Sequence, residues 1–152
     1  MIYYEDIVPG VPGTFGRYEV TREEVIDFAR KYDPQDFHLD DEAAAKGPFG
    51  QLAASGWHTA AITMRMIADN KAETDERARG GAGVDNLRWI RPVIPGDVLS
   101  VRRTCLDKRR SKSRPDIGIV RSLNETLDAA GEPVCQFESI VMFETRSPTG
   151  ED

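Results

Sequence analysis

The amino-acid sequence predicts an α+β fold in which one long central helix lies against an antiparallel β-sheet. Two observations lead to this prediction. Residues 56–70 are apolar almost all round at helical spacing, as expected of a buried helix. From residue 85 onward, segments of strand length alternate with turn-forming residues. Helices followed by a run of consecutive strands are typical of α+β proteins.

The length and charge of the chain limit the class of protein to which it can belong. Its 152 residues fit a single domain over 1–152, in which we expect a disordered tail over 146–152. The net charge of −6 argues against a nucleic-acid partner, and no apolar run reaches the roughly 20 residues that span a membrane. The first residues lack the pattern of a secretory signal, and two cysteines without ligand spacing predict no metal site. A cytoplasmic location is the expectation.

The first predicted helix follows a turn-rich opening and a short strand near 15–20. Thr21 and Glu24 have the spacing of a capping box, in which the two side chains satisfy free amide groups at a helix start. Apolar residues then recur at helical spacing as far as Tyr32. Pro34 ends this helix, because the residue before a proline is pushed out of the α region.

Two more helices precede the strands. A short helix over 42–46 has Asp40 or Asp41 as its cap. Ser55 is a candidate N-cap for the long helix over 56–70. Since apolar residues cover most of the circumference of that helix, we expect it to be buried rather than to lie on the surface.

The rest of the chain is predicted to be β-structure. The polar, glycine-containing stretch 71–83 is expected to be a mobile connection. Turn signals at Pro95-Gly96-Asp97 and Ala130-Gly131-Glu132 separate strands from each other. The predicted strands cover 85–93, 98–108, 117–128 and 133–145.

The candidate chemistry gathers around His38, which lies between two predicted helices near Asp33, Asp36 and Asp40. A histidine beside a carboxylate can be held in one tautomer and can move a proton near neutral pH. On spacing alone, a catalytic role and a role as solvated loop residues or helix caps both stay open. His58, inside the apolar helix, is better explained as a structural residue.

A basic run between 102 and 114 stands out in an acidic chain. It fits a solvated strand end and loop, or an anion site that binds the phosphates of a nucleotide-bearing substrate. The run consists of Arg102, Arg103, Lys108, Arg109, Arg110, Lys112 and Arg114.

The segment that ends at His38 resembles the MaoC-like dehydratases, the family of (R)-specific enoyl-CoA hydratases. The family motif is Gly-Asp-x-Asn-Pro-x-His, followed by Phe-Gly and His-Gly. The corresponding residues here are Tyr32-Asp33-Pro34-Gln35-Asp36-Phe37-His38, Phe49-Gly50 and Ser55-Gly56, and the segment 87–97 also matches. The chain departs from the motif at Gln35-Asp36 and at Ser55, and a serine or threonine of the family's buried helix has no clean match.

The resemblance implies a hotdog fold, in which the sheet wraps around the long helix, and a homodimer or a higher assembly of dimers. It also implies reversible addition of water to a trans-2-enoyl-CoA thioester, with CoA as part of the substrate and no metal or separate cofactor. Asp33 and His38 would be the catalytic pair. The amide of Gly56, at a helix N-terminus, would donate to the thioester oxygen.

Other residues are expected to bind the substrate, and two other functions remain open. A hotdog thioesterase would direct water to the thioester carbonyl, and a non-catalytic subunit would only bind the acyl-CoA. The sequence leaves the acyl group and the physiological direction undetermined. The expected substrate-binding residues are Phe49, Ser55, Trp57, Arg88, Arg91 and Arg110.

Overall fold

The computed structural model describes residues 1–148 of the chain. Two 3-10 turns, η1 and η2, cover Tyr4–Asp6 and Asp36–His38. The helices α1, α2 and α3 cover Arg22–Tyr32, Asp41–Ala45 and Gly56–Thr74. The strands β1 to β5 cover Pro12–Glu19, Ala78–Trp89, Val98–Arg110, Ile117–Leu127 and Pro133–Glu144.

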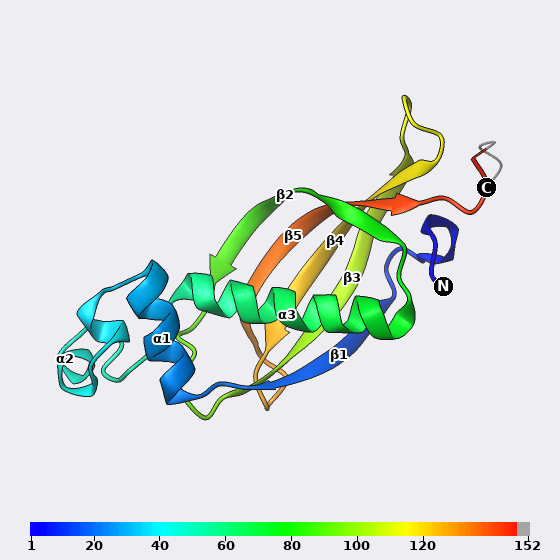
Figure 1. Cartoon of the computed structure of the whole chain (residues 1–152). Helices are drawn as coiled ribbons and strands as arrows, with labels where there is room; N and C mark the ends of the chain where they lie inside the picture. Colours follow the sequence, from blue (N-terminus) through cyan, green and yellow to red (C-terminus); the bar gives the residue numbers. More distant parts are fainter. Residues whose placement is uncertain (149–152) are drawn as a thin grey trace.

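The strands form one antiparallel sheet with the order β1-β3-β4-β5-β2. This sheet curls around α3, while α1 and α2 lie at the N-terminal end of α3 and η1 lies near its C-terminal end (Figure 1). A long helix wrapped by an antiparallel sheet is the α+β hotdog arrangement that the sequence predicts, and it is confirmed. The edge strands of the sheet are β1 and β2.

The main core lies between α3 and the inner face of the sheet. Along β4, fully and partly buried residues alternate, as expected of a strand with one face on the core. Thr63 of α3 and Thr126 of β4 are completely buried, and their hydroxyl groups lie 2.6 Å apart. This hydrogen bond fixes the middle of the helix against the sheet. The apolar core includes Val20, Val25, Ile62, Met66, Leu99, Val101 and Val134.

Helix α1 begins as predicted, but the capping box is only half formed. The side-chain oxygen of Thr21 accepts a hydrogen bond from the backbone amide of Glu24 at 3.3 Å. The carboxylate of Glu24 instead accepts a hydrogen bond from the hydroxyl of Tyr18. In α2 the cap is Asp40, whose carboxylate accepts from the amide of Ala43 at 2.8 Å.

The prediction of a mobile connection over 71–83 is wrong. Helix α3 continues to Thr74, Asp75 ends it with a left-handed φ of 50°, and β2 starts at Ala78. This strand lies at the sheet edge, and its pairing with β5 shifts register three times. Nearly all of its residues are exposed, so the sequence contains none of the apolar alternation that marks a half-buried strand.

Helix α3 has a buried face, as expected, but it is not buried around its whole circumference. Trp57 and Met64 are 57% and 54% exposed. The rest of the chain leaves this part of the helix surface uncovered. Within residues 1–148, no helix is both long enough and apolar enough to cross a membrane.

The predicted disordered tail falls partly outside the described residues, which end at 148. At its start, Arg146 is held in place. Its backbone amide donates to the carboxylate of Glu5 at 3.0 Å, and its side chain donates to Asp6 at 2.6 Å.

Candidate active site

Asp33 and His38 come together because the chain turns sharply between α1 and α2. Asp33 is the C-cap of α1, and its backbone amide still donates to Ala29. Pro34 then forces the chain out of the helix. The turn η2 brings His38 back, so that its Nε2 lies 3.4 Å from the carboxylate Oδ2 of Asp33.

The second ring nitrogen of His38 sets its tautomer. Nδ1 lies 2.6 Å from the carbonyl oxygen of Ala53. Because a carbonyl oxygen only accepts hydrogen bonds, Nδ1 carries the proton and Nε2 of the neutral ring is an acceptor. The His38 side chain is only 5% exposed, and that of Asp33 is 18% exposed. Two acceptors, Nε2 and Oδ2, therefore face each other in a largely buried place.

The carboxyl group of Asp33 stays ionised despite its partial burial. Burial acts to raise the pKa of Asp33, but the hydrogen bond from Gln35, the nearby hydroxyl of Ser55 and the charge that His38 can carry together lower it below its ordinary value. The Gln35 amide donates to Oδ1 of Asp33 at 2.6 Å. Gln35 is one of the departures from the family motif, and here it orients the carboxylate.

Ser55 does not cap α3 as predicted. Its hydroxyl lies close enough to Asp33 to lower the pKa of that carboxyl, but it makes no cap hydrogen bond. Within residues 1–148 it also has no partner in full hydrogen-bonding geometry, although the residue is completely buried. The first turn of α3 also contains no acidic residue. The positive end of the helix dipole is therefore left without a side-chain acceptor.

Gly56, the first residue of α3, packs directly against an indole ring. A Cβ at this position would lie 2.4 Å from Cε2 of Trp89, which no side chain can occupy without displacing the ring or the helix. The indole Nε1 of Trp89 donates to the Gly56 carbonyl at 2.7 Å. Among the described residues, none accepts a hydrogen bond from the Gly56 amide. Glycine thus brings the backbone close to the ring and leaves its amide available.

Aromatic residues lie beside His38 and beside Gly56. The ring of Phe49, 41% exposed, lies 6.3 Å from the His38 ring, centroid to centroid. Trp57 meets Trp89 edge to face, with centroids 5.1 Å apart. The structure therefore places the predicted residue Phe49 near the Asp33–His38 pair and the predicted residue Trp57 near Gly56.

His58 has the structural position that its sequence context favours. Its ring is buried and stacks on Phe28 with centroids 4.6 Å apart and planes 6° from parallel. Burial lowers the pKa of His58, against a weaker opposing effect of Glu24. No hydrogen bond links this ring to Asp33 or His38.

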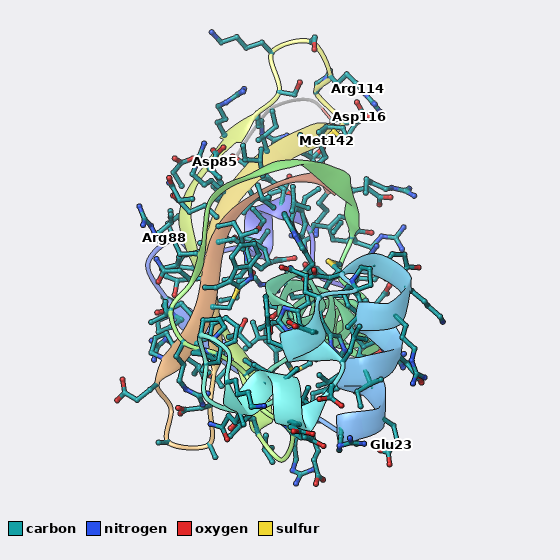
Figure 2. The ribbon with its side chains drawn as sticks, turned by 90° about the vertical axis from the view of Figure 1, so that its left-hand side faces the viewer. Glu23, Asp85, Arg88, Arg114, Asp116 and Met142 are labelled. Carbon is teal, nitrogen blue, oxygen red and sulfur yellow. The ribbon has the colours of Figure 1, made fainter. Side chains whose placement is uncertain are left out.

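The structure does not gather the three predicted arginines around the pair. The guanidinium of Arg91 is held by two carboxylates, those of Asp97 at 3.0 Å and Asp128 at 3.1 Å. Arg110 pairs with Glu5 of η1, at the far end of the fold from α1 (Figure 1). Arg88 is exposed and points to the outer side of β2, away from the helices (Figure 2).

The basic run is likewise largely neutralised by local acids. Arg102 forms a two-point contact with Glu125, and Arg114 pairs with Asp116 beside the β3–β4 turn (Figure 2). These pairs favour the solvated-strand interpretation of the run. In the part of the chain that the structure covers, no cluster of His, Cys, Asp and Glu side chains could hold a metal ion.

Sequence reasoning did not predict the contacts that three residues make at the site. The carbonyl of Ala53 fixes the His38 tautomer, Gln35 binds Asp33, and Trp89 covers Gly56. Ala53 acts through its backbone and leaves no signal in the sequence. Gln35 was recognised only as a departure from the motif, although it lies two residues from the carboxylate that it binds.

Comparison with known proteins shows which family and which relatives this chain is similar to. Residues 8–126 match the family described as MaoC like domain. An uncharacterized protein of Bacillus subtilis, YdeM, is 30% identical over 125 residues, which cover 82% of this chain and 86% of YdeM. The 3-hydroxyacyl-thioester dehydratase Z of Mycobacterium tuberculosis is 28% identical over 130 residues, and the match covers 82% of each chain.

A solved structure agrees over nearly the whole chain. The crystal structure of a MaoC-like dehydratase from Rhodospirillum rubrum is 40% identical and superposes with a TM-score of 0.84. The superposition covers 97% of this chain and 99% of the other. The resemblance in the sequence thus extends to the arrangement of the helices and the sheet.

Proposed function

Because this chain belongs to the MaoC-like domain family, which includes dehydratases, we propose that it adds water reversibly to trans-2-enoyl-CoA thioesters and yields (R)-3-hydroxyacyl-CoA. The observation that carries the proposal is the placement of Asp33 and His38. Their facing acceptor atoms lie 3.4 Å apart, and the other nitrogen of His38 is occupied by Ala53.

Two facing acceptors suit the activation of one water molecule. Water can donate one hydrogen to Nε2 of His38 and the other to Oδ2 of Asp33, which leaves an oxygen lone pair free to attack C3 of the enoyl group. One member of the pair takes up a proton as the C–O bond forms, and a proton is delivered to C2. The sum is addition of H and OH across the double bond. Such positioned proton transfer typically contributes about 10²- to 10⁴-fold in rate.

The N-terminus of α3 supplies the other half of the mechanism. Attack at C3 moves negative charge onto the thioester oxygen. The free amide of Gly56 can donate to that oxygen, and the helix dipole favours the charge there. Ser55, buried and without a hydrogen-bond partner among the described residues, lies next to this amide and can contact the bound water or the thioester.

The same proposal includes a homodimer and a place for the CoA. Strand β2 is an edge with free backbone groups, and apolar Trp57, Met64 and Val84 are more than half exposed on α3 and β2. A second copy that covers them would complete the site. We expect a dimer mass in sedimentation equilibrium. Arg88, which has no ion pair among the described residues, remains the candidate for CoA phosphate.

The test follows loss of the enoyl-thioester absorbance with crotonyl-CoA. Wild type, Asp33→Asn and His38→Ala are compared, with circular dichroism to confirm that each variant is folded. We expect (R)-3-hydroxybutyryl-CoA from wild type and at least a 100-fold loss of rate in both variants, consistent with about 10² or more from proton transfer. Wild type that releases free CoA instead would indicate a thioesterase. A protein that binds but does not convert a panel of enoyl-CoAs would indicate a binding subunit.

A further inference from the structure

A cavity of about 750 Å³ lies between the C-terminal half of α3 and the inner face of the sheet. Its walls come from α3, from the N-terminal segment and from all five strands. Asp33, His38 and Gly56 do not line it. Thr63 and Thr126, which bond to each other in the middle of the helix, do not line it either. The cavity therefore lies beyond the site that holds the catalytic pair.

Apolar side chains of α3 and β2 lie between that site and the cavity. Trp57, next to Gly56, and Met64 are separated by two helical turns, about 10 Å along α3, on the same side of the helix. Both are exposed, and Met64 lines the cavity. On β2, Trp89 lies against Gly56, and Val84 also lines the cavity. A chain attached at the site could follow the space between α3 and β2.

The part of the cavity wall formed by Ser122, Asn124 and Ser139, here called its floor, is polar. Asn124 is 1% exposed, and its side-chain nitrogen donates to the hydroxyl of Ser139 at 2.9 Å and to the backbone carbonyl of Ser122 at 3.3 Å. Both amide hydrogens are therefore used. The amide oxygen of Asn124 accepts no hydrogen bond from any residue within 1–148, and the hydroxyl hydrogen of Ser139 is not donated within that range. One acceptor and one donor are left over at the same place.

Among the described residues, the buried charges that line the cavity are paired with each other. Arg103 also lines the cavity, but Glu76 holds it through two contacts, at 2.6 and 3.1 Å. Glu76 is 6% exposed, so this pair is largely buried and its charges cancel. Lys71 lines the cavity from the end of α3 and is exposed to solvent. A neutral group fits the floor better than an ionised one.

We propose that this cavity receives the far end of a medium-length acyl chain and that Asn124 and Ser139 recognise a neutral hydroxyl group there. This inference rests on the proposed hydratase function. A hydroxyl both donates and accepts, so it can donate to the amide oxygen of Asn124 and accept from the hydroxyl of Ser139. A purely hydrocarbon chain end would leave the Asn124 amide oxygen and the Ser139 hydroxyl without hydrogen-bond partners. A site that hydrogen-bonds a hydroxyl group therefore disfavours an analogue that lacks the hydroxyl.

The experiment compares trans-2-decenoyl-CoA with its ω-hydroxy derivative. Wild type should prefer the hydroxylated chain in kcat/KM by about tenfold, the equivalent of one net hydrogen bond. Asn124→Leu and, separately, Ser139→Ala should remove most of this preference and leave the rate with crotonyl-CoA unchanged. Thr126→Val is the matched control, because it alters a buried polar residue of the same strand that does not line the cavity. Its preference should equal that of wild type.

Binding of saturated thioesters separates this inference from the hydratase proposal. Calorimetric titration with decanoyl-CoA and ω-hydroxydecanoyl-CoA measures recognition without reaction. Equal affinity for the two in wild type, or a preference that survives both Asn124→Leu and Ser139→Ala, would overturn the inference even if crotonyl-CoA is hydrated. The same titration with ω-carboxydecanoyl-CoA tests a charged chain end. Tighter binding of this thioester than of the ω-hydroxy thioester, lost in Lys71→Gln, would mean that Lys71 recognises a carboxylate and would also overturn the inference. A preference for the hydroxylated thioester in a protein inert toward all enoyl-CoAs would overturn the hydratase proposal alone.

Discussion

Replacing Gly56 by alanine tests whether the start of α3 must lie exactly where Trp89 holds it. The new Cβ would lie 2.4 to 2.7 Å from three atoms of the indole ring, whereas ordinary contact begins at 3.4 Å. The ring or the helix start must therefore move by about 1 Å. Overpacking of this kind costs about 1–3 kcal/mol. Because Trp89 is 46% exposed and can swing outward, we expect a stability loss near the lower limit.

The effect on activity should be larger than the effect on stability. A displacement of about 1 Å in a group that contacts the reacting atoms can lower the rate about 10²-fold. We therefore expect kcat with crotonyl-CoA to fall about 10²-fold in Gly56→Ala, with a change in tryptophan fluorescence and a small shift in the urea midpoint. Gly13→Ala, where a Cβ would have nothing within 4 Å, serves as the control and should match wild type.

A double variant can refute this reasoning. If the ring clash causes the loss, Gly56→Ala should cost far less in a Trp89→Ala background than in wild type, since the clashing atoms are gone. An unchanged cost in both backgrounds would mean that the methyl group itself obstructs the thioester. Full activity of Gly56→Ala would mean that the amide of Gly56 plays no part in the reaction.

Three other predictions follow from the contacts. The folded-state pKa of Asp33 is lowered, so its ionised form stabilises the fold above the ordinary carboxyl pKa and loses this effect as the pH falls through the lowered value. The difference in urea midpoint between wild type and Asp33→Asn should therefore shrink from pH 7 to pH 3, and a constant difference would contradict it. Thr63→Val breaks the buried hydrogen bond with Thr126 and should lower the free energy of unfolding by about 1–3 kcal/mol. In Thr126→Val the further change Thr63→Val should cost less, as a double-mutant cycle would measure. Arg88→Gln should raise KM for crotonyl-CoA but not for crotonyl-N-acetylcysteamine, which has no phosphates. Arg91→Gln should instead lower the urea midpoint, because it leaves two carboxylates without their partner.

Local signals in the sequence determined the elements that depend on neighbouring residues. The start of α1 follows from the Thr21 hydroxyl, and its end follows from the steric restriction before Pro34. That end also brings Asp33 within reach of His38, because only four residues lie between them. The candidate pair could therefore be named from the sequence, with its motif, before any distance was known.

The structure or exposure of residues that lack a local signal in the sequence was predicted wrongly, and the reason is the same in each case. Strand β2 has no apolar alternation because it is an exposed edge, and the exposure of Trp57 and Met64 follows from where the curved sheet ends. Helix and strand periodicity report which residues are apolar, but not whether another element covers them. The tautomer of His38 likewise depends on the backbone carbonyl of Ala53, fifteen residues away.

Long-range contacts decided which charged and polar residues are free. In the sequence, Arg91 and Arg110 look as available as Arg88, yet carboxylates distant in the chain occupy the first two. The cavity above Asn124 is formed where five strands and α3 meet, so no single segment encodes it. The sequence by itself predicted the fold class and the candidate pair Asp33 and His38. Only the tertiary structure decided the partners of each side chain, because those contacts join residues that are far apart in the chain.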